Sequence, residues 1–125
     1  MTLSHKELFD RYIYAGAVSR DPEAVAALFT EDGIYDAPLV DGDPLIGRDA
    51  VRDGIGAYQT DPSGLGTPNF EKTALVLHDT ADPDVFIAEI DAAFDSPEGP
   101  RTMSLVQIFR VRDGLIASLR DYFRW

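Results

Sequence analysis

The C-terminal segment of the chain places one carboxylate on a face that is otherwise apolar. From Leu115 the sequence alternates, and one face carries Leu115, Ala117, Leu119, Asp121, Phe123 and Trp125. The other face is more polar, so we expect Asp121 to point into the core. A buried carboxylate must be paired, or protonated through a raised pKa. Asp121 is therefore either an acid–base catalyst or a structural partner of an Arg or Tyr side chain.

The preceding segment brings an amide toward this carboxylate. Gln107 shares its predicted face with Met103, Leu105, Phe109 and Val111. A two-residue turn at 113–114 would set the two apolar faces on opposite sides of the sheet. A three-residue loop over 112–114 keeps them together and pairs Leu105 with Asp121. We therefore predict the longer loop, with Gln107 and Asp121 near one another on the inward face.

The elements that position these residues follow from capping signals and periodicity. Ser4 with Glu7 forms a capping box, and Asp21-Pro22 is typical of a helix start. The third helix carries Val51, Ile55 and Tyr58 on its apolar face. We predict helices over 4–19, 21–32 and 48–58, and strands over 34–38, 71–78, 85–94, 101–111 and 115–124. Helices followed by antiparallel strands indicate an α+β fold, with the helices on one face of a curved sheet.

Composition limits the partners and the chemistry. A chain of 125 residues fits one domain, residues 1–125, and its net charge of −11 argues against nucleic acid and anionic membranes. Cysteine is absent, and neither of the two histidines is spaced from other potential ligands as in a metal-binding motif. The N-terminal residues carry no apolar run. We therefore expect a cytoplasmic protein that uses no metal and no cofactor.

Three segments, in this order, resemble a known superfamily. They read D-P-E-A-V-A-A-L-F-T-E-D-G, P-L-I-G-R-D-A-V-R and Q-I-F-R-V-R-D-G-L-I-A-S-L-R-D-Y-F-R. The order is similar to that of the nuclear-transport-factor-2-like superfamily, which includes ketosteroid isomerases, SnoaL-like polyketide cyclases and limonene-type epoxide hydrolases. The resemblance implies a cone-shaped, curved, mixed or antiparallel sheet with three N-terminal helices on its concave face. This cone hosts unrelated chemistries and non-enzymes.

The resemblance also implies roles for single residues. Tyr12 matches the tyrosine that donates to the oxyanion in ketosteroid isomerase, an enzyme whose base position falls here on Ala37 and whose second acid falls on Gln107. Steroid isomerisation by that route is therefore not expected. Asp121 matches the last-strand carboxylate of SnoaL-like cyclases. Limonene-type hydrolases add an Arg-x-Asp pair, which reads Glu89-Ile90-Asp91 here.

The strand over 85–94 allows two orientations. Periodicity turns its purely apolar face to the core and leaves Glu89 and Asp91 outside. The resemblance turns these two acids inward instead. A strand that is apolar on both faces can also lie between a pocket and a dimer interface. Both orientations stay open at the level of the sequence.

We expect a small enzyme that cyclises or isomerises an apolar, carbonyl-bearing molecule. The expected catalytic residues are Asp121, Tyr12, Gln107 and Asp91. The expected lining residues are Tyr35, Glu89, Leu105, Phe109, Leu119 and Phe123. The alternatives are a limonene-type epoxide hydrolase and a non-catalytic ligand-binding or dimerisation module. A homodimer through the sheet is also expected, because apolar strand surface exceeds what one core needs, as shown by Phe86, Ile90, Phe94, Val106 and Ile108.

Overall fold

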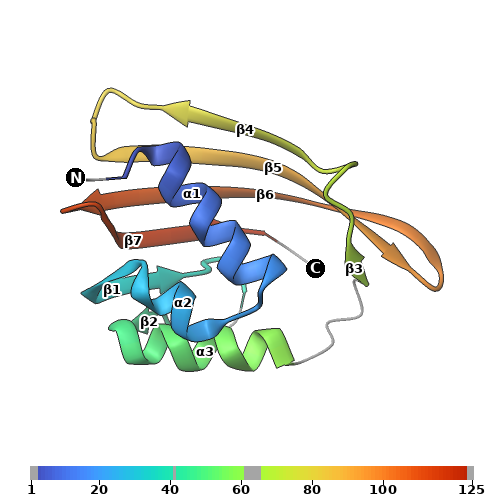
Figure 1. Cartoon of the computed structure of the whole chain (residues 1–125), viewed down its shortest axis with the longest axis horizontal. Helices are drawn as coiled ribbons and strands as arrows, with labels where there is room; N and C mark the ends of the chain where they lie inside the picture. Colours follow the sequence, from blue (N-terminus) through green and yellow to red (C-terminus); the bar gives the residue numbers. More distant parts are fainter. Residues whose placement is uncertain (1–2, 41, 61–65, 124–125) are drawn as a thin grey trace.

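A curved sheet with helices along one side makes up the computed structural model, which describes residues 3–40, 42–60 and 66–123 (Figure 1). The helical segments are α1 (His5–Ile13), the π-helix η1 (Tyr14–Val18), α2 (Pro22–Ala27) and α3 (Arg48–Thr60). The strands are β1 (Phe29–Asp36), β2 (Leu45–Ile46), β3 (Thr67–Pro68), β4 (Ala74–Asp79), β5 (Val85–Ser96), β6 (Gly99–Arg112) and β7 (Leu115–Tyr122). The predicted α+β class with three N-terminal helices is confirmed.

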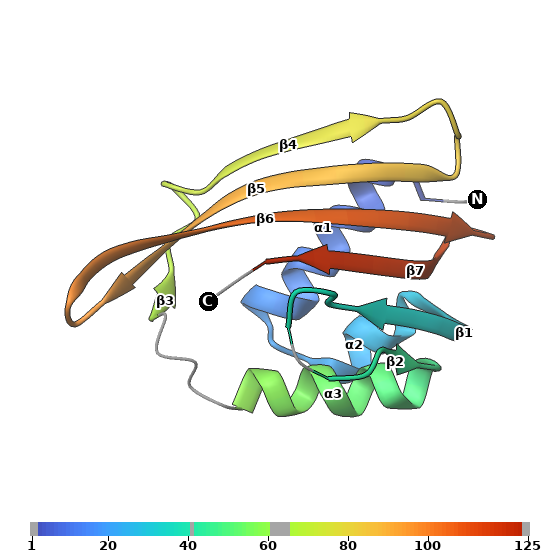
Figure 2. The same ribbon diagram turned by 180° about the vertical axis from the view of Figure 1, so that it is seen from behind.

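The strands form one mixed sheet in the order β2-β1-β7-β6-β5-β3, with β4 also paired to β5. Only β1 and β7 run parallel among the paired strands of the described residues. In Figure 1, α1 crosses the face of β5, β6 and β7, whereas α2 and α3 lie beside β1. Seen from behind, in Figure 2, no helix of the described chain covers β4 to β7. The helices therefore enclose one face of the sheet and leave the other open.

The first helix is fixed at its start by the predicted capping box. Ser4 Oγ accepts a hydrogen bond from the Glu7 amide at 3.1 Å, and Glu7 Oε1 accepts one from the Ser4 amide at 3.2 Å. The single α-helix predicted over 4–19 is wrong in its second half, because the chain widens into the π-helix η1 after Ile13. A π-turn is rare and frees carbonyl groups for other donors.

The second helix is shorter than predicted. It ends at Ala27, and Phe29 already begins β1, where it pairs with Ile116 of β7. Phe29 is an apolar residue at helical spacing, which is why the periodicity was compatible with a helix. Hydrogen bonds to other elements replace the helical ones here. The Ile116 amide of β7 donates to the Leu28 carbonyl, and the Arg48 guanidinium donates to the Phe29 carbonyl.

The turn between β6 and β7 corrects the predicted register. Asp113 and Gly114 both have positive φ, 54° and 78°, and form a two-residue turn in which Arg112 pairs with Leu115. The predicted three-residue loop is therefore wrong. Gln107 pairs directly with Asp121.

An extra residue in β7 reconciles this short turn with the apolar pattern. The partners of Arg110 and Val111 are Ser118 and Ile116, so Ala117 is a bulge. The bulge lets Ile116 and Leu119 both face the core, where neither is exposed to solvent. Strict alternation had wrongly assigned Leu115 and Ala117 to that face.

The orientation of β5 follows the periodicity and not the resemblance. Phe86, Ala88 and Ile90 are buried beneath the helices. Glu89 and Asp91 point outward: Glu89 Oε1 lies 2.9 Å from His78 Nε2, and Ser104 Oγ donates to Asp91 at 2.6 Å. The inward placement of both acids was therefore wrong. Phe86 and Ile90 also leave the predicted dimer surface, because both belong to the core.

Candidate active site

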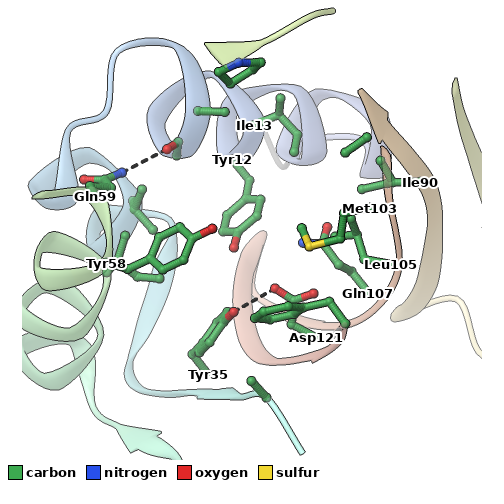
Figure 3. Close-up of a pocket in the computed structure, with 18 of the residues that line it drawn as sticks. Tyr12, Ile13, Tyr35, Tyr58, Gln59, Ile90, Met103, Leu105, Gln107 and Asp121 are labelled. Carbon is green, nitrogen blue, oxygen red and sulfur yellow. Dashed lines mark hydrogen bonds between the residues drawn. The ribbon is translucent and has the colours of Figure 1, made fainter. Parts of the chain in front are cut away.

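A cavity of about 690 Å³ opens between the helices and the concave face of the sheet. Its wall is mainly apolar, with Ile13 from α1, Ile90 from β5, and Met103 and Leu105 from β6 among the residues that face it (Figure 3). Tyr12, Tyr35, Tyr58 and Gln107 lie at one end, around Asp121 of β7, whereas Gln59 lies apart from them. The sheet supplies this arrangement, since the inward residues of β6 and β7 stand opposite each other in the ladder.

Asp121 is a buried carboxylate with one strong hydrogen bond. It is 6% exposed, and the Tyr35 hydroxyl donates to its Oδ2 at 2.7 Å. Its Oδ1 has no hydrogen-bond partner within the described part of the chain. Burial raises the pKa of Asp121 to about 6, and the polar groups of Tyr35 and Gln107 partly oppose this shift by favouring the ionised form. Asp121 can therefore exchange a proton near neutral pH.

Three phenols surround this carboxylate. Tyr12 comes from α1, Tyr35 from β1 and Tyr58 from the last turn of α3, and their hydroxyls converge in Figure 3. Burial raises the pKa of all three, and the nearby charge of Asp121 adds to the shift. The three phenols therefore stay protonated near neutral pH and can donate hydrogen bonds.

Gln107 completes the polar end of the cavity. It is 4% exposed and lies directly opposite Asp121 across the β6–β7 ladder. Its Oε1 finds no hydrogen-bond partner among the described residues. A neutral amide at this position can donate to a developing negative charge without competing with Asp121 for a proton.

The structure separates the predicted lining residues into two groups. Tyr35, Leu105 and Phe123 line the cavity, together with Tyr12, Gln107 and Asp121. Phe109 and Leu119 do not line it. Both are fully buried, and Phe109 stacks on Phe86 with ring centroids 4.6 Å apart. Both residues belong to the core beneath the site, and the rings of Phe9 and Tyr12 of α1 meet the Phe109 ring edge-on with centroids 5.8 and 5.5 Å apart.

The remaining predicted residues lie elsewhere. Glu89 and Asp91 are exposed on the outer face of β5 and do not line the cavity. Trp125, predicted on the Asp121 face, lies outside the described residues.

Four polar residues that line the cavity were not predicted as site residues: Asp43, Tyr58, Gln59 and Thr73. Tyr58 was recognised only as part of an apolar helix face. Gln59, the next residue, also lines the cavity, and its Nε2 donates to the carbonyls of Gly16 at 3.0 Å and Ala15 at 3.4 Å. Those carbonyls belong to the π-helix η1, which no sequence signal had indicated. These hydrogen bonds hold the end of α3 against η1, which fixes the region that carries Tyr58.

The charged groups of the described residues do not form a metal centre. No group of three His, Asp or Glu side chains in residues 3–40, 42–60 and 66–123 could hold a metal ion. Within the same residues, no helix is long and apolar enough to cross a membrane.

Comparison with known proteins places the chain in a family. Residues 9–119 match the SnoaL-like domain. The fold is similar to that of a candidate isomerase from Bacillus subtilis, with 21% identity, 95% of this chain and 85% of that chain covered, and a TM-score of 0.75. No curated protein gave a significant match.

Two further solved structures show the same fold. One is the epoxide hydrolase/cyclase-like enzyme SalBIII of pyran ring formation in the polyether salinomycin, at 22% identity, with coverage of 95% and 89% and a TM-score of 0.71. The other is a candidate polyketide cyclase from Pseudomonas putida KT2440, at 21% identity, with coverage of 98% and 92% and a TM-score of 0.67. With the family match over residues 9–119 and the nuclear-transport-factor-2-like cone, the chain belongs to the SnoaL-like domain family.

Proposed function

We propose that this domain is an acid–base enzyme that cyclises or isomerises an apolar, carbonyl-bearing small molecule through side chains alone. The observation that carries the proposal is the buried carboxylate of Asp121 at the polar end of an apolar cavity, held by Tyr35. A group with a pKa of about 6 takes and returns protons efficiently near neutral pH.

In the proposed reaction, ionised Asp121 removes a proton from the carbon next to a carbonyl group. The electron pair of the broken C–H bond moves to the carbonyl oxygen and forms an enolate. Tyr12, Tyr58 and Gln107 supply neutral donors for that oxygen. The enolate carbon then attacks a second carbonyl group in the same molecule and forms an alkoxide, or a conjugated enolate is reprotonated at its remote carbon. Asp121 returns its proton to the alkoxide oxygen in the first case and to that carbon in the second.

The donors limit which substrates can react. Phenols and an amide stabilise an enolate less than a protonated carboxylic acid would, and Gln107 stands where ketosteroid isomerases carry that acid. Substrates whose α-protons are already fairly acidic, such as polycarbonyl compounds, therefore suit this site best.

The alternative of limonene-type epoxide hydrolysis loses support. That reading needs a second carboxylate beside Asp121 to activate water, and Asp91 faces the opposite side of the sheet. A non-catalytic ligand-binding module would use the same cavity without proton transfer, so a direct test of proton transfer separates the two.

Exchange of α-protons for deuterium provides that test. β-Tetralone is an apolar ketone whose exchange in heavy water can be followed by NMR with and without the protein. We expect the protein to accelerate the exchange, and Asp121→Asn to lower the acceleration by about 10²-fold or more. Asp91→Asn is the matched control, because it removes a carboxylate from the outer face and should leave the rate unchanged.

Variants of the donors extend the same test. Tyr12→Phe and Gln107→Leu should each slow the exchange. A folded Asp121→Asn variant with the wild-type rate would overturn the proposal, and unchanged rates in both donor variants would remove the enolate-stabilising role.

A further inference from the structure

The charges around the cavity are of one sign. The described lining residues include two carboxylates, Asp121 at the inner end and Asp43, and they include no Lys, Arg or His. The polar groups that face Asp121 from the neighbouring elements are all neutral: Tyr12 of α1, Tyr35 of β1, Tyr58 of α3 and Gln107 of β6.

The cations near the cavity are engaged elsewhere. Arg20 influences Tyr58 electrostatically, but its guanidinium donates to the backbone carbonyl of Gln59 and it does not line the cavity. Arg52 is surrounded by acids, with Asp53 at 3.0 Å, Asp49 at 3.5 Å and Glu23 at 3.8 Å. The chain as a whole carries a net charge of −11.

An anionic ligand would find no compensation in this environment. Its anionic group would lose its hydration shell on entering the apolar cavity. It would also be repelled by the Asp121 carboxylate, with no cation among the described lining residues to offset either cost. An uncharged ligand would lose little hydration free energy on entering the cavity, and the phenol and amide groups could donate hydrogen bonds to one of its carbonyl oxygens.

We infer that the cavity selects uncharged molecules and rejects ligands that carry a carboxylate, sulfonate or phosphate group. The substrate of the proposed reaction is therefore an uncharged molecule. This inference rests on the proposed function, which assigns the cavity as the substrate site. Any acidic group of the natural substrate must therefore be esterified or absent when it reaches this protein.

Two fluorescent probes with the same carbon skeleton test the selection. N-Phenylnaphthylamine is uncharged, and anilinonaphthalenesulfonate adds one sulfonate that stays ionised over the whole working pH range. Near pH 8, where Asp121 is ionised, we expect the neutral probe to bind about tenfold or more tightly than the sulfonate. Excess neutral probe should displace any sulfonate that shares the cavity.

Titration of Asp121 supplies a second arm that needs no mutation. The pKa of about 6 means that Asp121 is mostly protonated near pH 5, so the preference for the neutral probe should narrow there. The Asp121→Asn variant should show a smaller ratio between the affinities for the neutral and the sulfonated probe than the wild type, even near pH 8. Glu31→Gln is the matched control: it removes the same charge from an exposed position outside the lining and should leave the preference unchanged.

The outcomes separate this inference from the function on which it rests. Equal affinity for the two probes near pH 8, or a preference insensitive to both Asp121→Asn and pH, would overturn the charge selection alone and leave the exchange experiment with β-tetralone intact. Failure of the neutral probe to bind at all would overturn both, because the cavity would then not be a site for apolar molecules.

Discussion

Asp121 lowers the stability of the fold whenever it is ionised, because its burial is not compensated by a cation. Its pKa is about 6 in the folded protein, against about 3.9 for an unperturbed aspartate. Between these values the folded chain binds more protons than the unfolded chain. The free energy of unfolding therefore falls as pH rises through this window, by up to roughly 3 kcal/mol from this one group.

The Asp121→Asn variant should remove that penalty. Near pH 8 we expect it to be more stable than the wild type by about 1–3 kcal/mol, and near pH 4 the two should converge. Denaturant unfolding at both pH values measures the difference. A variant that is less stable than the wild type near pH 8 but equally stable near pH 4 would show that the ionised carboxylate contributes favourable interactions, and would contradict the predicted penalty.

Tyr35 is the residue that holds Asp121 in its ionised form. Tyr35→Phe removes the donor to Oδ2, so the pKa of Asp121 should rise further. Tyr122→Phe is the matched control, since Tyr122 follows Asp121 but lies beside Arg120 on the other side of β7. NMR titration of the Asp121 carboxyl carbon in both variants reads the effect. A shift of equal size in the two variants would argue against a specific hydrogen bond.

At the scale of elements, helix α3 shows how sequence and packing can disagree. Gly54 and Gly56 both weaken the helix by propensity. A Cβ at Gly56 would meet Pro22 at 3.5 Å, an ordinary contact, whereas a Cβ at Gly54 would overlap the end of the Leu45 side chain of β2. The first glycine therefore allows a close approach between α3 and β2, and the second has no such role.

Alanine substitutions should separate the two glycines. Gly56→Ala should stabilise the protein by about 0.5–1 kcal/mol through helix propensity. Gly54→Ala should gain less, or destabilise, because the Leu45 side chain must move. Thermal or denaturant unfolding of the two variants gives the comparison, and a larger gain for Gly54→Ala would contradict the close packing.

Local signals were sufficient for some elements and insufficient for others. The capping box at Ser4, the helix start at Asp21 and the strands β4, β5, β6 and β7 could be predicted, because caps and alternation act within a few residues. The bulge at Ala117 could not, since it depends on how a two-residue turn must be reconciled with the apolar faces of two strands. The apolar periodicity of β5 indicated the outward orientation of Glu89 and Asp91, whereas the family resemblance implied an inward one.

The candidate site divides in the same way. Asp121, Gln107 and Tyr12 could be placed from strand faces and helix spacing. Tyr58 and Gln59 could not, because their place depends on the π-helix η1 and on the packing of α3 against it.

At the scale of the whole molecule, we propose that two chains pair through the open face of the sheet. That face lacks a covering helix in the described residues and exposes Val76 and Val106, with Ile87 and Ile108 partly buried beside them. Light scattering at micromolar concentration should return the mass of a dimer, and Val106→Glu should shift it toward the monomer. A monomer mass for the wild type would contradict this assembly.

The account depends most on the ionisation of one side chain. NMR titration of the carboxyl carbon of Asp121 in the intact wild-type protein measures it directly. A midpoint near 6 is predicted, because burial in the apolar cavity outweighs the hydrogen bond from Tyr35. A midpoint below about 4, the ordinary value for a solvated aspartate, would contradict the acid–base role at the centre of the proposed function.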